Sequence, residues 1–421
     1  MRILVLGGGG REHALCWTLA RSGHEVLCGP GNAGIASVAR LVELQVDDPA
    51  AVVGAASAEA VDLVVVGPEA PLVAGVADAL TKVGIPVFGP TAEGARIEGS
   101  KAFSKAVMAE AGVATAGYWT GTDPDATKRA LDGFAPPYVV KADGLAAGKG
   151  VRICADRAEA EDAIDDAMVR QVFGAAGTTV VIEEFMTGPE VSLFGLCDGS
   201  TVVPLVPAQD FKRALDGDAG LNTGGMGAYS PVPAVTPAMV EEARRAVLQP
   251  VLDALKARGI DYVGVLYAGL MLTPDGVKVL EFNARFGDPE TQVVLPRLRS
   301  DLGALLLACA TGRLAEFGPL EWDERACVTV IMASGGYPGE YATGVPIHGL
   351  DEASSVEDVM VFHAGTRRDG DAVVTAGGRV LAVSAFGDDI AASRGRAYDA
   401  VGRIGFDSAH YRRDIAEHPT T

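Results

Sequence analysis

The sequence predicts an α/β protein of several domains, beginning with a doubly wound parallel sheet. Its 421 residues favour two to four domains over one. Over residues 1–100, short apolar segments alternate with amphipathic ones, as in βαβ units. Glycine-rich turns follow several of these apolar segments, at the sheet edge where open α/β sheets bind ligands.

The first domain, residues 1–100, rests on four apolar segments that are typical of strands buried on both faces. They are 2–6, 25–28, 61–67 and 85–89. Amphipathic periodicity predicts helices over 11–21 and 72–83 between them.

A second domain is predicted over residues 101–312 and a third over 325–421. The second has predicted strands at 138–143, 180–185, 191–196, 262–272 and 277–282, and helices at 157–168, 237–257 and 300–311. The third has predicted strands at 327–333, 359–363, 372–375 and 379–386 and a helix at 389–404. This order predicts an α+β domain at the end of the chain.

Composition and charge exclude several classes of protein. A hydrophobic content of 48% with 21% charged residues is typical of a folded globular chain. The formal charge of −20 argues against a nucleic-acid partner, which would require excess lysine and arginine. The six cysteines have no CxxC spacing, so we expect neither disulfides nor a zinc site. The apolar segment 2–6 is too short for a signal peptide or a membrane span, so we expect a cytoplasmic protein with no membrane partner.

The glycine cluster GGGGREHA at 7–14 follows the first predicted strand. A dinucleotide fingerprint fits poorly, because Glu12 or His13 occupies the third glycine position and the second strand ends without an acidic residue. A glycine turn before a helix N-terminus can still bind an anion; the alternative is a tight strand-to-helix turn without a ligand. The loops at 30–34 and 67–72 are expected on the same rim, where Glu69 could bind a hydroxyl or an amine.

The segment KADGLAAGKG at 141–150 resembles a P-loop only superficially, because its spacing is one residue short and Gly150 replaces the hydroxyl residue. Its glycines could nevertheless fold backbone N–H groups over phosphates, with Lys149 adding a charge. Lys141 ends an apolar strand, where a lysine is costly unless it pairs with an anion.

The segment 180–190 runs from an apolar strand into Glu183, Glu184, Phe185 and Met186. Backbone groups there could bind a purine edge and the apolar side chains its ring, while Glu190 could accept hydrogen bonds from ribose. An edge strand with solvated acids explains these residues equally well.

The segment VLEFNARFGDPET at 279–291 is the strongest indication of chemistry. Side chains of a strand repeat every two residues, so Glu281, Asn283 and Arg285 are expected on one face. A carboxylate and an amide oxygen suit Mg²⁺ that takes its remaining ligands from water and phosphates. Arg285 could bind a phosphate or a developing acyl phosphate through its planar donors.

Residues 209–231 are too long and glycine-rich for a simple connection. Asp210, Lys212 and Arg213 form a mixed-charge group suited to a zwitterionic or phosphorylated substrate. The TGGMGAYSP stretch that follows is expected to form a wall lined by backbone.

In order along the chain, these segments resemble the ATP-grasp superfamily and, within it, the glycinamide ribonucleotide synthetase family. The similar stretches are GGGGREHA, PGNAG, VGPEAPL, GSKAFSK, KADGLAAGKGV, IEEF, NTGGMGAYSP, YAGLM, EFNARFGDPETQ and GGYPG, followed by HAGT and GGRVL. They span residues 7–339, with the last two at 363–366 and 377–381.

The resemblance implies that the second domain is an ATP-grasp domain with a mobile lid at about 121–187. It further implies four groups of site residues. Those for ATP are Lys101, Lys141, Gly144, Gly148, Gly150, Glu183, Glu184, Phe185, Met186 and Glu190, with Glu281 and Asn283 as metal ligands and Arg285, Lys149 and Asp210 as catalytic residues. Those for the other substrates are Gly9, Arg11, Glu12, Gly31, Asn32, Glu69, Lys212, Arg213, Gly225, Gly287 and Asp288.

The implied reaction joins glycine to 5-phosphoribosylamine, with ATP and Mg²⁺ or Mn²⁺ as cofactors, in a chain expected to be monomeric. One departure concerns the metal: YAGLM at 267–271 is apolar where many ATP-grasp enzymes have a further acidic ligand, so a second metal held by side chains is in doubt. Three alternatives remain open: another ATP-grasp ligase or carboxylase, a nicotinamide-dependent oxidoreductase, and a non-catalytic nucleotide-binding module.

Overall fold

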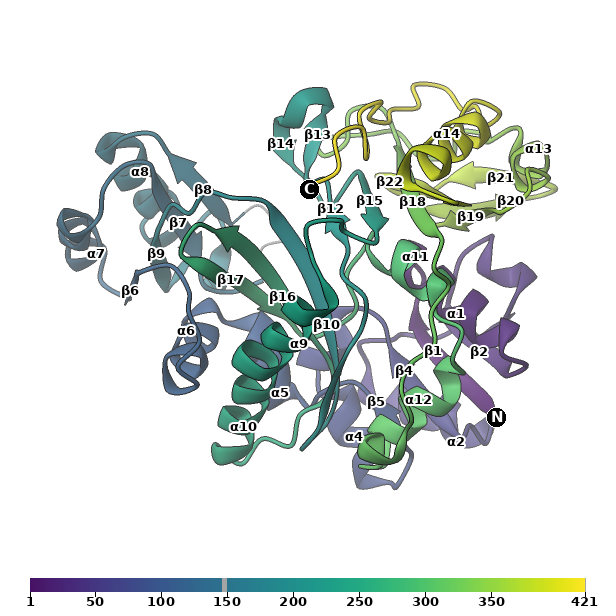
Figure 1. The fold of residues 1–421 in the computed structure, drawn as a ribbon, viewed down its shortest axis with the longest axis horizontal. Helices are drawn as coiled ribbons and strands as arrows, with labels where there is room; N and C mark the ends of the chain where they lie inside the picture. Colours follow the sequence, from purple (N-terminus) through teal and green to yellow (C-terminus); the bar gives the residue numbers. More distant parts are fainter. Residues whose placement is uncertain (146–149, 421) are drawn as a thin grey trace.

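The computed structural model describes residues 1–145 and 150–420. Within these residues, four sheets of four or five strands form the framework. In Figure 1 the N-terminal sheet (β1, β2, β4) and the C-terminal sheet (β18, β19, β22) lie on one side of the central strands β10, β16 and β17, and a separate lobe with β6–β9, α7 and α8 lies on the other.

The N-terminal sheet is parallel and doubly wound, as predicted, with the order β3-β2-β1-β4-β5. Its strands are β1 (Arg2–Gly7), β2 (Glu25–Pro30), β3 (Arg40–Leu41), β4 (Leu63–Val66) and β5 (Val87–Phe88), and its helices are α1 (Gly10–Arg21), α2 (Pro49–Ala58), α3 (Glu69–Val73) and α4 (Val76–Lys82). The prediction of one helix over 72–83 is wrong: Gly75, at φ 83°, ends α3 and begins α4 in a left-handed conformation that favours glycine.

The lobe on the far side, which we call the lid, is an antiparallel sheet of order β6-β9-β7-β8 with two helices. Its elements are β6 (Tyr118–Gly121), α7 (Pro124–Ala130), β7 (Tyr138–Ala142), β8 (Val151–Cys154), α8 (Arg157–Met168) and β9 (Val180–Glu184). It has its own apolar core, in which Ile164 of α8 packs with Tyr138 and Ile182 of the sheet. A segment with its own core can move as a unit.

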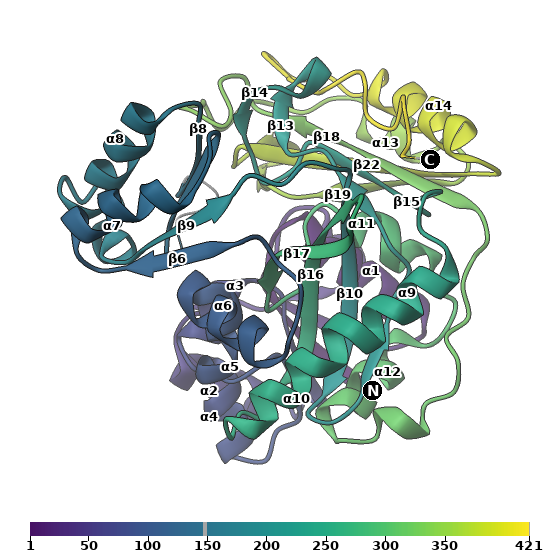
Figure 2. The same ribbon diagram turned by 60° about the vertical axis from the view of Figure 1, so that its left-hand side comes forward.

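The central sheet is antiparallel, with the order β11-β10-β16-β17. Its strands are β10 (Glu190–Asp198), β11 (Val202–Pro204), β16 (Val263–Thr273) and β17 (Gly276–Asn283). Helices α9 (Pro237–Ala243) and α10 (Gln249–Ala257) lie along this sheet (Figure 2), and the other helices of the region are α5 (Ala92–Gly99), α6 (Lys101–Glu110), α11 (Thr291–Val294) and α12 (Leu302–Ala310). Between α9 and α10 the predicted single helix widens into a π-helical turn, Arg244–Leu248, just before Pro250, which has no N–H to donate.

A bulge in β17 determines which way its polar residues point. The register shifts between the pairs Gly269↔Glu281 and Leu270↔Val279, so β17 contains one extra residue there. Val279 and Phe282 both belong to the same apolar core, although strict alternation would put them on opposite faces. The bulge therefore turns Glu281 to the face opposite this core.

The C-terminal sheet has the order β12-β15-β18-β22-β19. Its strands are β12 (Gln209–Asp210), β15 (Gly227–Ser230), β18 (Ala326–Ala333), β19 (Val359–His363) and β22 (Arg379–Gly387), next to α13 (Leu350–Ser354) and α14 (Ile390–Val401). Two small ribbons complete the chain: β13 (Arg213–Leu215) with β14 (Ala219–Asn222), and β20 (Thr366–Asp369) with β21 (Ala372–Thr375). Thus β12 and β15, which precede α9 in sequence, join the sheet of the last domain by antiparallel pairing of β15 with β18.

Among residues 1–145 and 150–420, no helix is both long and apolar enough to cross a membrane.

Candidate active site

Three strands of the central sheet present polar groups on one face. Ser192, Gly269 and Glu281 lie in one cross-strand row, and Phe194, Tyr267 and Asn283 in the next. A Cβ on Gly269 would lie 3.5 Å from Cγ of Glu281, so the small residue leaves space beside the carboxylate. The predicted pair Glu281 and Asn283 therefore lies together on an open part of the sheet.

Positive charges surround the Glu281 carboxylate. Burial alone would raise its pKa, but four cations outweigh burial and lower the pKa: Lys212, Lys141, Lys101 and Arg285. These cations come from four separate parts of the chain, namely the 209–222 segment, the lid, α6 and the end of β17. Three of the cations also have carboxylate partners of their own, so charges of both signs are concentrated around Glu281.

Lys141, at the end of β7, is buried and bound to a carboxylate. Its Nζ lies 2.9 Å from Oε1 of Glu183 on β9, and Nζ of Lys105 on α6 lies 3.3 Å from Oε2 of the same residue. Glu183, predicted to contact ATP, is thus held between two lysines, with 2% of its surface exposed. Lys105 is not among the residues predicted from the sequence.

The residues predicted to contact the purine, Glu184, Phe185 and Met186, come directly after Glu183 in the sequence. The Glu184 carboxylate accepts a hydrogen bond from the backbone N–H of Gly117 (2.9 Å), and the Glu184 N–H donates to the Gly117 carbonyl (2.9 Å). Phe185 is 41% exposed and Met186 partly buried. The end of β9 thus has apolar side chains at the lid boundary, while the Glu184 carboxylate is bound to the backbone N–H of Gly117.

The glycine loop is described only at its ends. The Lys101 ammonium lies within 3.4 Å of the Asp143 carbonyl and 3.3 Å of the Gly144 carbonyl. The Asp143 carboxylate caps α6 through the Ala102 N–H (2.6 Å), and the Gly150 carbonyl accepts from Ala142. The predicted residues Gly148 and Lys149 lie outside the described residues.

Asp210 and Lys212 lie above the same face. Nζ of Lys212 donates to Oε2 of Glu190 at 2.5 Å. Burial alone would lower the pKa of Lys212, but Asp210 and Glu190 raise it well above its usual value. Burial also raises the pKa of Asp210, to about 7, against the opposing effect of Lys212. Arg213, predicted with them, instead donates to the Gly220 carbonyl of its own hairpin.

Arg285 is held by carboxylates of the N-terminal part of the chain. Its Nη2 donates to Oε1 of Glu98 at 2.8 Å, and Oε2 of Glu98 accepts from the Ala284 N–H at 2.8 Å. Oε2 of Glu69 lies 3.6 Å from the Nε of Arg285. This Nε is buried without a hydrogen bond among the described residues, which leaves one guanidinium donor for a ligand.

At the glycine turn before α1, the predicted substrate residues bind one another. Glu12 accepts from the Gly9 N–H (2.6 Å) and from Nε of Arg11 (2.5 Å), and Nη1 of Arg11 donates to the Phe286 carbonyl (3.1 Å). Arg11 and Glu12 are both buried. Arg11 therefore fastens α1 to the segment that follows β17, and Glu12 fastens the glycine turn to α1.

Asn32 also makes contacts within the protein. Its Nδ2 donates to the carbonyls of Gly8 (2.9 Å) and His363 (2.7 Å), and its Oδ1 accepts from the N–H groups of Gly34 and Ile35. The adjacent Gly31, at φ 72°, donates from its backbone to the Gly7 carbonyl. These contacts join the N-terminal rim to β19 of the C-terminal sheet.

Asp288 lies where the three parts of the chain meet. It lies 3.0 Å from Nη2 of Arg379 and accepts from Nε2 of Gln292 at 2.7 Å. Burial would raise its pKa, but Arg379 and Arg11 lower it. A Cβ on Gly9 would lie 3.8 Å from Asp288 Oδ2, so the first glycine turn borders this carboxylate.

The remaining predicted glycines allow loops to approach closely. A Cβ on Gly225 would lie 2.4 Å from Cδ of Pro289, and one on Gly287 2.6 Å from Oε2 of Glu290. Glu290 is itself buried and accepts from Ser192 (2.8 Å) and Tyr267 (2.9 Å). The 223–227 and 287–290 loops thus pack on the central sheet.

The donor set at Glu281 and Asn283 fits one divalent metal that shares its coordination with phosphates and water. The carboxylate is ionised by its cationic surroundings, and both ligands are oxygens. In the described part of the chain, no group of three or more His, Cys, Asp or Glu residues could enclose a metal by itself. The protein would therefore supply only part of the coordination shell.

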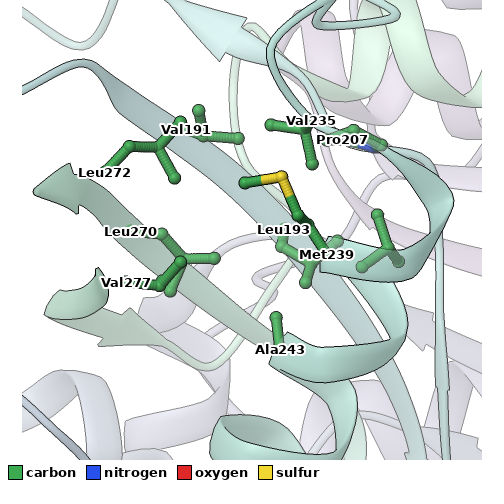
Figure 3. Close-up of a pocket in the computed structure, with 10 residues that line it drawn as sticks. Val191, Leu193, Pro207, Val235, Met239, Ala243, Leu270, Leu272 and Val277 are labelled. Atoms are coloured by element: carbon green, nitrogen blue, oxygen red, sulfur yellow. The ribbon is translucent and has the colours of Figure 1, made fainter. Parts of the chain in front are cut away.

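An apolar pocket lies elsewhere, under α9 (Figure 3). It is lined by Val191, Leu193, Pro207, Val235, Met239, Val240, Ala243, Leu270, Leu272 and Val277. These side chains offer no polar group to orient a ligand, and Val277 belongs with the core on the face opposite Glu281. This pocket is a packing gap separate from the site.

Several residues of the site were not predicted: Glu98, Lys105, Asp143, Glu290 and Arg379. Lys105 follows Lys101 by one helical turn, which is the one local signal that could have suggested it. The others meet their partners across long stretches of sequence, such as the 91 residues between Asp288 and Arg379.

Comparison with known proteins extends these observations over the whole chain. Three models of phosphoribosylglycinamide synthetase match in succession: the N domain over residues 1–98, the ATP-grasp (A) domain over 99–291 and the C domain over 327–418. A phosphoribosylamine–glycine ligase of Streptomyces coelicolor is 57% identical over 99% of both chains, and one of Synechocystis is 49% identical over 99% of both.

Solved structures agree with these matches. The crystal structure of phosphoribosylamine–glycine ligase from Thermotoga maritima superposes with a TM-score of 0.86 at 33% identity, covering 99% of this chain and 100% of that one. The biotin carboxylase domain of a Hydrogenobacter thermophilus 2-oxoglutarate carboxylase, at 16% identity and a TM-score of 0.75, covers 97% of this chain and 91% of that one and shares only the fold. The resemblance inferred from the motifs is confirmed: the chain belongs to the phosphoribosylglycinamide synthetase family.

Proposed function

We propose that this chain joins glycine to 5-phosphoribosylamine, converting ATP to ADP and phosphate and producing glycinamide ribonucleotide. Full-length relatives with the name phosphoribosylamine–glycine ligase support the substrates. The single structural observation that carries the chemistry is the Glu281 carboxylate among four cations, on the open face of the central sheet. ATP-grasp enzymes use ATP with a divalent metal, and this site suits that pair.

The reaction proceeds in two steps. An oxygen of the glycine carboxylate attacks the γ-phosphorus of ATP, the bond to the β-phosphate oxygen breaks, and glycyl phosphate and ADP result. The amine of phosphoribosylamine then attacks the glycyl carbonyl, the bond to the phosphate oxygen breaks, and the amine loses a proton. Both steps require positioning and charge neutralisation more than a nucleophilic side chain.

The nucleotide is proposed to lie between the lid and the central sheet. Lys101 and Lys141 bind its phosphates, supported by their proximity to Glu281. The family resemblance assigns residues 144–150, of which 146–149 lie outside the described residues, to the phosphates, and the 184–186 strand end is proposed to contact adenine. Water exclusion by the lid protects the acyl phosphate from hydrolysis.

Glu281 and Asn283 are proposed to bind the metal, which we take to be Mg²⁺ or Mn²⁺ because both ligands are oxygens. When bound, this ion neutralises charge on the transferred phosphate. Arg285 stabilises the acyl phosphate, with Glu98 fixing one side of its guanidinium and the buried Nε left for the ligand.

Glycine is proposed to lie near Asp210 and Lys212, whose opposite charges match its ammonium and carboxylate. Phosphoribosylamine is assigned to the rim formed by the Gly9 turn, the 287–288 loop and Gly225. The side chains of Arg11, Glu12 and Asn32 are already paired within the protein, so we assign them the role of holding the loops of this rim in place.

The substrates can be tested by measuring ADP release with each omitted in turn, using phosphoribosylamine generated in the assay. We expect release only with glycine and phosphoribosylamine together. Release that depends on another amino acid, or on bicarbonate and biotin, would favour the ATP-grasp alternatives. Tight binding of a nicotinamide nucleotide without Mg-ATP binding would favour the oxidoreductase.

Two further assignments complete the proposal. A cytoplasmic location is supported by six cysteines that are all buried and free of disulfides. A monomer is proposed from the sequence and would be tested by sedimentation velocity, where a single species of the 43.3 kDa chain is expected.

A further inference from the structure

Two lysines share one buried carboxylate at the boundary between the lid and the central body. Lys105 belongs to α6, whereas Lys141 and Glu183 belong to lid strands β7 and β9. Lys105 is 2% exposed and Lys141 7%. A buried lysine is costly without a counter-ion, so Glu183 is the group that makes both lysines tolerable there.

Lys105 is fixed by contacts besides the ion pair. Its Nζ donates to Oγ1 of Thr115 at 2.7 Å and lies 5.3 Å from the ring centre of Tyr118. Oγ1 of Thr115 donates in turn to the Val279 carbonyl of β17 at 2.6 Å. The ammonium group thus has a set position between the connection into the lid and the strand that carries Glu281.

Within the group of Lys105, Lys141 and Glu183, one carboxylate faces two ammonium groups. The next carboxylate is Glu281, which raises the pKa of Lys105 and has its own pKa lowered by Lys141. Because Lys105 is also fixed by Thr115 on the side of the lid connection, Lys141 is the lysine of this pair that is assigned to the proposed phosphate site.

We propose that Lys105 is a positioning residue for the nucleotide: by neutralising Glu183, it leaves the Lys141 ammonium free to bind a phosphate of ATP. Without Lys105, Glu183 would form its ion pair with Lys141 alone. The Lys141 ammonium would then interact less strongly with the phosphates of the nucleotide. This inference rests on the proposed ATP site and assigns Glu183 the role of a shared counter-ion.

The test measures binding of Mg²⁺ with the non-hydrolysable ATP analogue AMP-PNP by calorimetry, so that turnover is not required. Lys105→Met should weaken binding roughly tenfold, because a charge-assisted interaction with phosphate is reduced. Lys105→Met combined with Glu183→Gln removes the charge pair as a unit and should bind more tightly than Lys105→Met alone. A merely structural lysine would not produce this recovery.

Lys128→Met is the matched control, because Lys128 is a lid lysine paired with Asp165 at 2.7 Å and partly exposed, and we expect it to bind like the native chain. Native-like binding by Lys105→Met, or a double variant as weak as Lys105→Met, would overturn the inference. If the native chain itself bound no AMP-PNP, the proposed function would fail as well.

A pH series tests the same idea without a destabilising substitution. Burial lowers the pKa of Lys105 to about 8, although Glu183 opposes the shift. The charged and titratable groups facing it are Glu183, Lys141, Glu281 and Tyr118. In the native chain, AMP-PNP binding should therefore weaken as the pH rises through 8. Lys105→Arg stays protonated and should weaken less; identical pH dependence in both proteins would contradict the inference.

Discussion

The nucleotide half of the site and the N-terminal rim both contain buried charged side chains, yet they differ in how those charges are satisfied. At the rim, Arg11 and Glu12 pair with each other, and Asn32 uses both ends of its amide within the protein. Around Glu281, four cations face one carboxylate. Burial and polarity are therefore shared by both regions, but only around Glu281 do four cations act on one carboxylate that has no ion-pair partner of its own among the described residues.

The difference separates two uses of polar residues that look alike in a sequence. A paired group holds elements together, because breaking it leaves its partner unsatisfied. A group of excess like charges is tolerated only where a ligand of opposite charge binds. The predictions below test whether this distinction holds.

The largest effect on turnover is expected for Glu281, at the centre of the nucleotide half of the site. Glu281→Ala should lower kcat by roughly 10³-fold, comparable to the loss of a principal transition-state contact. The melting temperature should change little, because no ion pair joins Glu281 to a neighbour in the described residues. Steady-state kinetics at saturating Mg²⁺, with circular dichroism as the fold control, would measure both. Near-native turnover would refute the metal assignment.

Arg285→Lys should follow, with kcat lower by about 100-fold. A lysine keeps the charge but cannot bind Glu98 and a phosphate together through a planar group. The matched control is Arg96→Lys on α5, where the arginine forms an exposed pair with Glu93. Equal turnover in both variants would mean that charge alone suffices at position 285.

At the rim the expected loss is of stability. Asn32→Ala removes four hydrogen bonds and should lower the free energy of unfolding by about 3 kcal/mol. Urea unfolding would measure it, with Asp48→Ala, which removes an exposed helix cap, as a milder control. A large loss of turnover at unchanged stability would instead support the role in substrate binding that was predicted for Asn32 from the sequence.

The smallest effect of a single substitution is expected at His13, through the pH dependence of stability at the contact between the rim and β19. Burial lowers the pKa of His13 to about 3 and that of His363 to about 4. Both are depressed below the unfolded value of about 6.5, so the unfolded chain binds more protons below that pH. Stability is complete above pH 6.5 and should fall on acidification toward pH 4.

Each histidine contributes up to about 1.4 kcal/mol per pH unit in this range, less where solvent reaches the ring. Urea unfolding at pH 7 and 5 would measure the slope, and His13→Gln should reduce it. An unchanged slope in this variant would show that other groups cause the loss.

The sequence predicted most of the fold and the centre of the site for identifiable reasons. The strands have continuous apolar segments, and the EFNAR segment places unlike polar residues at a strand end. Alternation along the strand predicts a shared face for Glu281 and Asn283, and it applies from Glu281 onward. The bulge that selects this face is invisible in the sequence, because it depends on pairing with β16.

The site residues that were not predicted also depend on contacts between distant parts of the sequence. Glu98 meets Arg285 across 187 residues, and Asn32 meets His363 across 331. No local pattern predicts such contacts. The sequence alone therefore does not distinguish a motif residue that binds other parts of the protein, such as Asn32, from one that binds a ligand. The helix break at Gly75 and the π-helical turn before Pro250 have local causes, and both could have been foreseen from residue type.

The pairing of β15 with β18 has a consequence for how the chain can be divided. The peptide between residues 313 and 325 joins the central and last domains, but it is not their only link. Proteolytic cleavage there should leave two fragments that stay associated and migrate together on gel filtration. A fragment ending before β18 would expose the edge of β15 that pairs with β18, so the two domains depend on each other for stability more than their order along the chain implies.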